Sequence, residues 1–155
     1  MDKTTQISEL VQPVRDDLLS GAAEVALRAI TIFQTVMQDQ TDPAELKKML
    51  TDTSEALIDA QPAMAPVFHL CNSVLLGIRS ANTVDEIKNS CDEALTNFEK
   101  QLCDSAEVIA DKVYELIPPG EVVFAYSFSS TVVSCLLNAR SKGRFFRVAC
   151  TEARP

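Results

Sequence analysis

Tryptophan is absent from this sequence of 155 residues, and histidine occurs once, as His69. A single imidazole supplies only one histidine ligand for a metal ion. The five cysteines form no CxxC pair and no spacing typical of zinc ligands. We therefore expect no metal ion and no cofactor. The cysteines are interpreted as reduced thiols, most of them buried in the predicted helices and strands.

Long apolar runs are missing as well. The longest uncharged stretches, such as residues 122–139, which is broken by Tyr126 and several serines, do not form a membrane span. Residues 1–10 carry three charged side chains and lack the apolar core and cleavage site of a secretory signal. These two absences predict a cytoplasmic protein with no membrane contact.

Basic residues are fewer than acidic ones, 14 against 22, which gives a net charge of −8. This balance disfavours attraction to nucleic-acid backbones or to anionic lipid. We expect protein partners or a small ligand, with no direct nucleic-acid contact. The hydrophobic fraction of 46% is sufficient for the core of an ordinary globular protein.

The chain up to Leu116 has apolar residues three or four positions apart, the spacing of amphipathic helices. We predict five helices, over residues 5–18, 22–38, 43–61, 62–81 and 83–116. Pro13 is expected to kink or split the first helix, and Ser20 or Gly21 to cap the second. Asp42, followed by a proline, and Thr83, with a glutamate three positions later, are the stronger start signals.

The apolar stripe of 83–116 has a further consequence, because it continues over the whole helix. We expect a helical bundle to cover that stripe along its full length. On 62–81 the predicted buried face includes Phe68, and His69 is interpreted as a packed core residue rather than a base. Asp16 and Asp17 are interpreted as a solvated helix end, with a ligand patch as the alternative.

After Pro118 the pattern changes from helix to strand. The predicted elements are a buried strand at 121–126, a helix at 129–141 that closes at Gly143, and a second strand at 144–150. This order predicts an α-helical N-terminal bundle followed by the first β-α-β unit of a Rossmann-like parallel α/β domain. We place the domains at 1–117 and 118–155. Two strands cannot cover their own faces, so we expect the second domain to be incomplete.

Residues 117–155 read IPPGEVVFAYSFSSTVVSCLLNARSKGRFFRVACTEARP. They combine a glycine before a buried strand, a Ser-x-Ser turn, a helix ending in Lys-Gly-Arg, and a second strand running into Thr-Glu-x-Arg-Pro. This combination resembles the alpha, beta and delta subunits of translation initiation factor 2B, with weaker similarity in 20–30 and 61–70. The family also contains isomerases of ribose 1,5-bisphosphate and methylthioribose 1-phosphate. The resemblance implies that this chain corresponds to the front half of a typical member.

The resemblance also implies that residues used by the isomerases are replaced or missing in this sequence. Their catalytic cysteine stands at the position of Ser127, and their phosphate-contacting arginine stands at the position of Ser20. A serine hydroxyl is far less acidic than a thiol, and no histidine is near it in the sequence. The aspartate that pairs with the cysteine belongs to the second half of those proteins. We therefore lean toward a protein that is not an enzyme.

The turn from Ser127 to Thr131 lies where a strand leads into a helix N-terminus, a position that favours anions. Capping of the helix by Ser129 or Ser130 is the simpler interpretation, and the two roles are compatible. At the end of the second strand, Glu152 and Arg154 either face a ligand cleft or form an ion pair. The candidates for ligand or phosphate binding are Ser20, Gly21, Ser127, Ser129, Ser130, Thr131, Glu152 and Arg154.

Three functions are consistent with these observations. The first is a regulatory-subunit-like binding and assembly protein, in a homo-oligomer or a family-type hetero-complex, which senses a phosphorylated small ligand. The second is a sugar-phosphate isomerase that uses other acids and bases. The third is a dimerisation module formed by the helical domain.

Overall fold

The structure of the protein, a computed structural model, describes residues 3–151. The chain forms two compact units, one ending at Glu99 and the other beginning at Lys100. We refer to them as the helical unit and the α/β unit. The domain boundary at 117/118, placed where the sequence changes from helix to strand, stays a prediction.

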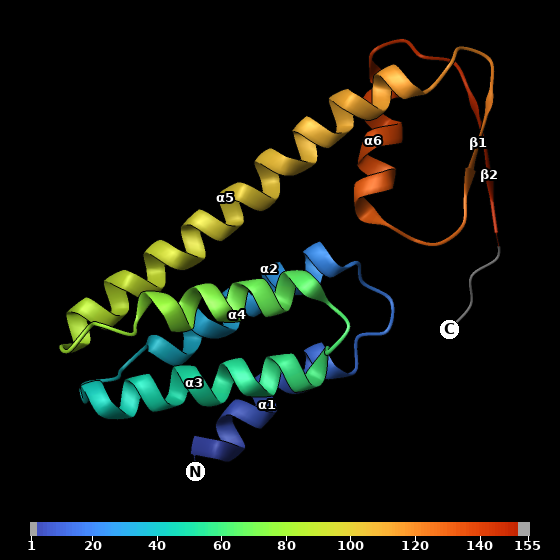
Figure 1. Ribbon diagram of the computed structural model, residues 1–155. Helices are drawn as coiled ribbons and strands as arrows, with labels where there is room; N and C mark the ends of the chain where they lie inside the picture. The colour runs from blue at the N-terminus through green and yellow to red at the C-terminus, as the bar shows by residue number, and fades with distance from the viewer. Residues whose placement is uncertain (1–2, 152–155) are drawn as a thin grey trace. The chain divides into compact units, whose positions relative to one another are not determined.

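The helical unit is built from five helices, drawn from blue to yellow-green in Figure 1: α1 Lys3–Arg15, α2 Ala22–Met37, α3 Pro43–Ala60, α4 Ala65–Gly77 and the first part of α5 Val84–Leu116. Helices α1, α2 and α3 contact one another, and α4 packs against α2 and α3. The predicted helical bundle is confirmed. No helix of the described residues is both long enough and apolar enough to cross a membrane.

Two of the predicted start signals have the expected hydrogen bonds. Asp42 Oδ1 accepts from the Glu45 N–H at 2.7 Å and caps α3. Thr83 Oγ1 accepts from the Glu86 N–H at 3.2 Å, and the Glu86 carboxylate accepts from the Thr83 N–H at 3.2 Å, which completes a capping box. Helix α1 runs through Pro13 as one helix.

The core of the helical unit is formed by large aliphatic side chains and one aromatic ring. Its largest fully buried members include Phe33, Leu46, Leu50, Leu57, Leu70 and Ile87. Helix α4 comes close to α5 at Gly77, where an added Cβ would lie 3.2 Å from the Ser90 carbonyl oxygen. A glycine at this position therefore allows the two helix backbones to approach.

Three burial predictions for the helices were wrong. Phe68 is 54% exposed, and His69 is also exposed. The centres of their two rings are 6.1 Å apart, in an edge-on arrangement. The buried face of α4 consists of Val67, Leu70, Cys71 and Val74, so both aromatic residues fall outside its angular range. The stripe of α5 is covered only in part: Ile87, Cys91 and Leu95 are buried, whereas Ile109 and Leu116 are exposed, because α5 extends beyond the helical unit.

The α/β unit contains the end of α5 and the predicted β-α-β arrangement: β1 Val122–Ala125, α6 Ser130–Ser141 and β2 Arg147–Cys150. The strands pair in parallel, with Val123 opposite Val148 and Ala125 opposite Cys150. The parallel strand-helix-strand unit is thus confirmed. The prediction that the first strand is buried was wrong: no residue of β1 is fully buried, and Phe124 is 66% exposed, because two paired strands do not cover their own faces. Phe145, just before β2, is 67% exposed.

Helix α6 ends in a Schellman turn. Gly143 has φ of +83°, its N–H donates to the Arg140 carbonyl at 3.0 Å, and the Arg144 N–H donates to the Ala139 carbonyl at 3.0 Å. Only glycine adopts this backbone conformation without strain. The turn fixes the direction in which the chain enters β2.

The capping bond of α3 gives a direct stability test. Asp42→Ala removes the side-chain acceptor for the Glu45 N–H and should lower the free energy of unfolding by about 1 kcal/mol. Asp42→Asn keeps an acceptor oxygen and should leave stability nearly unchanged. Urea unfolding followed by circular dichroism measures both, and an equal loss in the two variants would refute the assignment of the cap.

Candidate functional site

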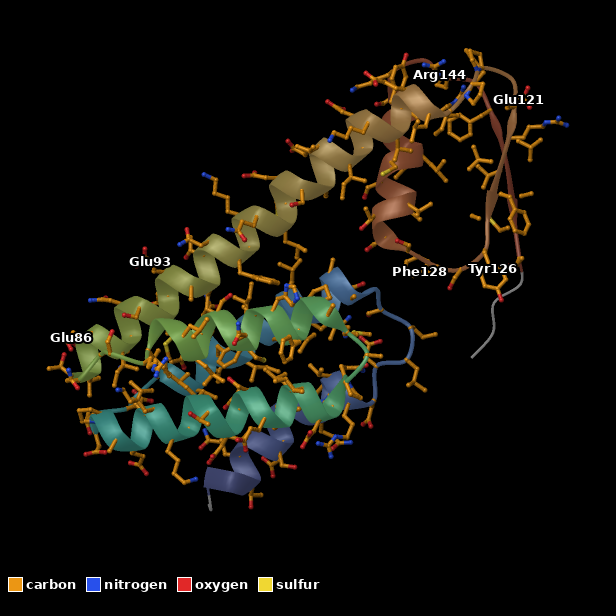
Figure 2. The ribbon with its side chains drawn as sticks, in the orientation of Figure 1. Glu86, Glu93, Glu121, Tyr126, Phe128 and Arg144 are labelled. Carbon is orange, nitrogen blue, oxygen red and sulfur yellow. The ribbon has the colours of Figure 1, made fainter. Side chains whose placement is uncertain are left out.

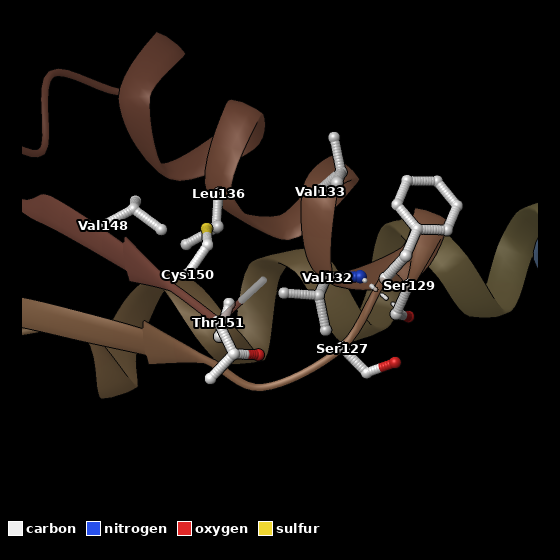
Figure 3. A pocket seen from close by; sticks show the side chains of 10 residues that line it. Ser127, Ser129, Val132, Val133, Leu136, Val148, Cys150 and Thr151 are labelled. Carbon is white, nitrogen blue, oxygen red and sulfur yellow. Dashed lines mark hydrogen bonds between the residues drawn. The ribbon is translucent and has the colours of Figure 1, made fainter. Parts of the chain in front are cut away.

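The turn between β1 and α6 is shaped by the cap of α6. Ser129 has extended backbone dihedral angles, its Oγ accepts from the Val132 N–H at 3.4 Å, and its carbonyl accepts from the Val133 N–H at 3.0 Å (Figure 3). Ser129 is therefore the N-cap of α6. The N–H groups of Ser130 and Thr131 have no acceptor within the described residues.

A cavity of about 250 Å³ lies beside this turn, at the carboxyl ends of both strands. Its walls are mainly apolar, and its polar groups are three hydroxyls and one thiol. The lining residues are Ala125, Ser127, Phe128, Ser129, Val132, Val133, Leu136, Val148, Cys150 and Thr151. The part of the lining that the structure describes contains no carboxylate, imidazole or ammonium group.

Thr151 holds the two strand ends together at the rim of the cavity. Its N–H donates to the Ala125 carbonyl at 3.1 Å, and its hydroxyl donates to the Tyr126 carbonyl at 3.1 Å. The parallel pairing is thereby extended by one residue beyond β2. The backbone on both sides of the cavity is consequently fixed by hydrogen bonds.

Cys150 is a pocket residue that sequence reasoning missed. The sequence suggests a buried thiol, but Cys150 is exposed and lines the cavity together with Ser127, with Thr151 between them in Figure 3. The register explains its place, since Cys150 pairs with Ala125 just before the turn. Parallel pairing with equal strand lengths was the signal that could have identified it.

The candidates Ser20 and Gly21 belong to the helical unit, in the connection between α1 and α2. Gly21 is the N-cap of α2 and makes no side-chain bond there. The Ser20 hydroxyl accepts from Arg28 Nη2 at 3.1 Å, so a cation already contacts this serine. The turn 127–131 belongs to the α/β unit, and Glu152 and Arg154 lie outside the described residues.

Asp17 organises the connection that carries Ser20. Its Oδ1 accepts from the N–H groups of Leu19 at 3.0 Å and Ser20 at 2.8 Å, and its Oδ2 pairs with Arg28. Gln61 donates to the Asp17 carbonyl from the end of α3. Hydrogen bonds from Ser20 and Leu19, together with the Arg28 charge, lower the pKa of Asp17 to about 2. The interpretation as a solvated helix end was wrong for Asp17, whose side chain is 9% exposed.

Within the described residues, no group of three or more histidine, cysteine, aspartate or glutamate side chains could hold a metal ion. The chemistry available in the cavity is therefore that of hydroxyl groups, one thiol and the free N–H groups at the start of α6. Such a set can bind an anion by hydrogen bonding. It includes no charged acid or base.

A helical bundle followed by a parallel β-α-β unit, with a cavity at the carboxyl ends of the strands, defines the class: a helical domain joined to a Rossmann-like α/β fold. Residues 18–155 match the Initiation factor 2 subunit family, and the chain belongs to that family. This agrees with the resemblance seen in residues 117–155.

Curated relatives carry two kinds of name. The chain is 25% identical over 150 residues to a "Putative translation initiation factor eIF-2B subunit 2-like" protein of Pyrococcus horikoshii, covering 97% of this chain and 51% of that protein. It is 20% identical to a "Ribose 1,5-bisphosphate isomerase" of Methanocaldococcus jannaschii, covering 100% of this chain and 50% of that protein. The chain thus spans about half the length of the curated relatives it matches.

Solved structures share the fold. The translation initiation factor eIF-2B structure from Pyrococcus horikoshii OT3 superposes with a TM-score of 0.83 at 23% identity, over 97% of this chain and 51% of the other. A subunit of the tetrameric eIF2B-beta2-delta2 complex from C. thermophilum gives a TM-score of 0.74 at 23% identity, over 96% of this chain and 50% of the other. These similarities support the helical N-terminal part followed by the β-α-β unit.

The lowered pKa of Asp17 predicts a pH-dependent contribution to stability. In the unfolded chain the carboxyl titrates near its ordinary value of 3.8, and in the folded protein near 2. The stabilisation is fully present above the unfolded value and is lost as the pH falls through the folded value. Asp17→Ala should therefore be less stable than the original protein at pH 7, and the difference should shrink between pH 4 and 2. A difference that stays constant over this range, in urea unfolding, would contradict the proposed interactions.

The cysteines should divide into two groups in a labelling experiment. Burial raises the pKa of both the Cys71 and Cys91 thiols to about 12, which leaves little thiolate at neutral pH. Cys103 and Cys150 are exposed and should react with a maleimide first. Mass spectrometry of peptides gives the order, with the guanidinium-unfolded chain as the control in which all five react. Labelling of Cys71 as fast as of Cys150 would overturn the assignment of burial.

Proposed function

We propose that this chain belongs to a non-catalytic binding and assembly protein, similar to the regulatory subunits of initiation factor 2B, which recognises a phosphorylated small ligand. The observation that carries the proposal is the composition of the cavity. Ser127 stands where the resemblance places the catalytic cysteine, and among residues 3–151 no charged acid or base lines the cavity around it. The only histidine of the chain, His69, belongs to the helical unit.

Ligand binding is supported by the start of α6. The free N–H groups of Ser130 and Thr131 and the hydroxyls of Ser127 and Ser129 belong to one short segment. Backbone N–H groups at a helix N-terminus bind phosphate well, since the helix dipole adds to their hydrogen bonds. The Ser129 cap is compatible with this role, because its hydroxyl occupies only the Val132 N–H.

Assembly is supported by the family and by the surface of the α/β unit. The solved relatives include a tetrameric complex of eIF2B subunits, and other curated relatives bear initiation-factor subunit names. In this chain Phe124 in β1, Tyr126 just after β1 and Phe145 before β2 are each more than 60% exposed. Apolar residues exposed in this way are typical of surfaces that another polypeptide covers.

The alternative function is a sugar-phosphate isomerase, and one observation favours it. Cys150 supplies a thiol to the same cavity from the neighbouring strand, so the cavity does contain a group that can act as a nucleophile or, once ionised, as a base. Some relatives bear the name ribose 1,5-bisphosphate isomerase. No carboxylate lines the cavity within the described residues to complete such a site.

The experiment assays turnover and binding together, with the longest natural protein that contains this chain. Ribose 1,5-bisphosphate and methylthioribose 1-phosphate are each offered as substrate, and ligand binding is followed by the amide NMR signals of Ser130 and Thr131. We expect shifts of these two signals without product formation. Ser127→Ala should weaken binding by about fivefold, the effect of one lost hydrogen bond, whereas Ser134→Ala, outside the cavity, should not.

Two outcomes would decide against the proposal. Turnover abolished by Cys150→Ser would establish the isomerase instead and assign the thiol its role. Unchanged amide signals at millimolar concentrations of both sugar phosphates would remove ligand recognition from this cavity.

A further inference from the structure

A basic cluster occupies the end of the α/β unit opposite the cavity. Residues 121–151 contain four cations, Arg140, Lys142, Arg144 and Arg147, and one acidic residue, Glu121, which lies at the same end of the strands as Arg144. In Figure 2, Arg144 lies at one end of the strands and Tyr126 and Phe128 at the other. A local concentration of positive charge is unexpected in a chain whose net charge is −8.

Aromatic rings hold two of these guanidinium groups in place. The Arg144 guanidinium lies 4.3 Å from the centre of the Tyr114 ring, and the Arg140 guanidinium lies 4.4 Å from the centre of the Phe145 ring. Cation–π contacts of this kind restrict side chains that otherwise move freely in water. Fixed guanidinium groups lose less entropy when they bind a carboxylate.

Arg144 is the anchor of the cluster rather than its contact surface. Its Nη2 donates to the Tyr114 carbonyl at 3.4 Å, in the last turn of α5, where a cation is favoured by the helix dipole. Its Nε is buried and has no hydrogen-bond partner within the part of the chain that the structure describes. The Schellman turn at Gly143 fixes the backbone beside it.

The remaining three cations differ in whether they have an acidic partner. Lys142 is paired with Asp111 and lies 5.5 Å from the centre of the Tyr114 ring. Arg140 and Arg147 are exposed, and neither has an acidic partner among residues 3–151. These two arginines are therefore the groups available to a partner.

We propose that this cluster is a docking surface for a carboxylate-rich segment of a protein partner, with Arg140 and Arg147 as the contacting groups. Charge complementarity selects an acidic partner, and the fork of each guanidinium matches the two oxygens of a carboxylate. Nucleic acid is the less suitable partner. The Tyr114 ring already contacts two of the chain's own cations, Lys142 and Arg144, so it is not free to stack on a base. Two exposed arginines are also few for binding along a phosphate backbone.

The test measures binding of a fluorescent oligoglutamate peptide to the whole chain by anisotropy. The double variant Arg140→Gln/Arg147→Gln should bind about fivefold more weakly, because two exposed ion pairs are lost. The matched control, Lys100→Gln/Lys112→Gln, changes the net charge equally in the same unit and should keep its affinity. The single variant Arg147→Gln should retain the fold, because this side chain has no ring or ion-pair partner among the described residues, and should give part of the loss.

Three outcomes would overturn the proposal. The first is no binding of the peptide by the original protein at low salt. The second is an equal loss in the control variant, which would indicate a response to net charge alone. The third is tighter binding of single-stranded DNA of equal charge, which would identify the cluster as a nucleic-acid surface. Circular dichroism of each variant verifies that the helices are retained.

Discussion

Parallel pairing of β1 with β2 is the constraint on which the α/β unit depends. Two parallel strands need a crossover connection, and α6 with its two turns provides it. The pairing brings both carboxyl ends to one edge, where Ser127, Cys150 and Thr151 line one cavity. It sends the Schellman turn and the basic cluster to the other edge. One topological choice therefore separates the cavity from the basic cluster.

The chemistry of the cavity follows from what lines it. Hydroxyls and free N–H groups bind an anion without ionising, but moving a proton requires a group that titrates near neutral pH. Apart from hydroxyls, the described lining offers one ionisable side chain, the Cys150 thiol. Binding an anion requires only hydrogen-bond donors from these residues, whereas isomerisation also requires proton transfer. The family contains proteins named for both roles.

Sequence reasoning succeeded where the signal is local. The caps at Asp42 and Thr83, the end of α6 at Gly143 and the parallel order of the last elements depend on residues a few positions apart. It failed at Phe68 and His69 because a rotation of one position moves a helical residue out of the core. Asp17 was misread because its partner Arg28 is 11 residues away.

Two features of the α/β unit could not be predicted from the sequence, because they also depend on residues that are far apart in the chain. The place of Cys150 depends on the register of β2 against β1, which the composition of the strands does not specify. Arg144 and Tyr114 are 30 residues apart, so their contact depends on how the end of α5 meets the turn after α6. The most direct test of the account is therefore the strand register, measured as cross-strand NOEs in isotope-labelled protein. Contacts of Val123 with Val148 and of Ala125 with Cys150 are predicted, whereas contacts of Val122 with Cys150 would indicate antiparallel strands and contradict it.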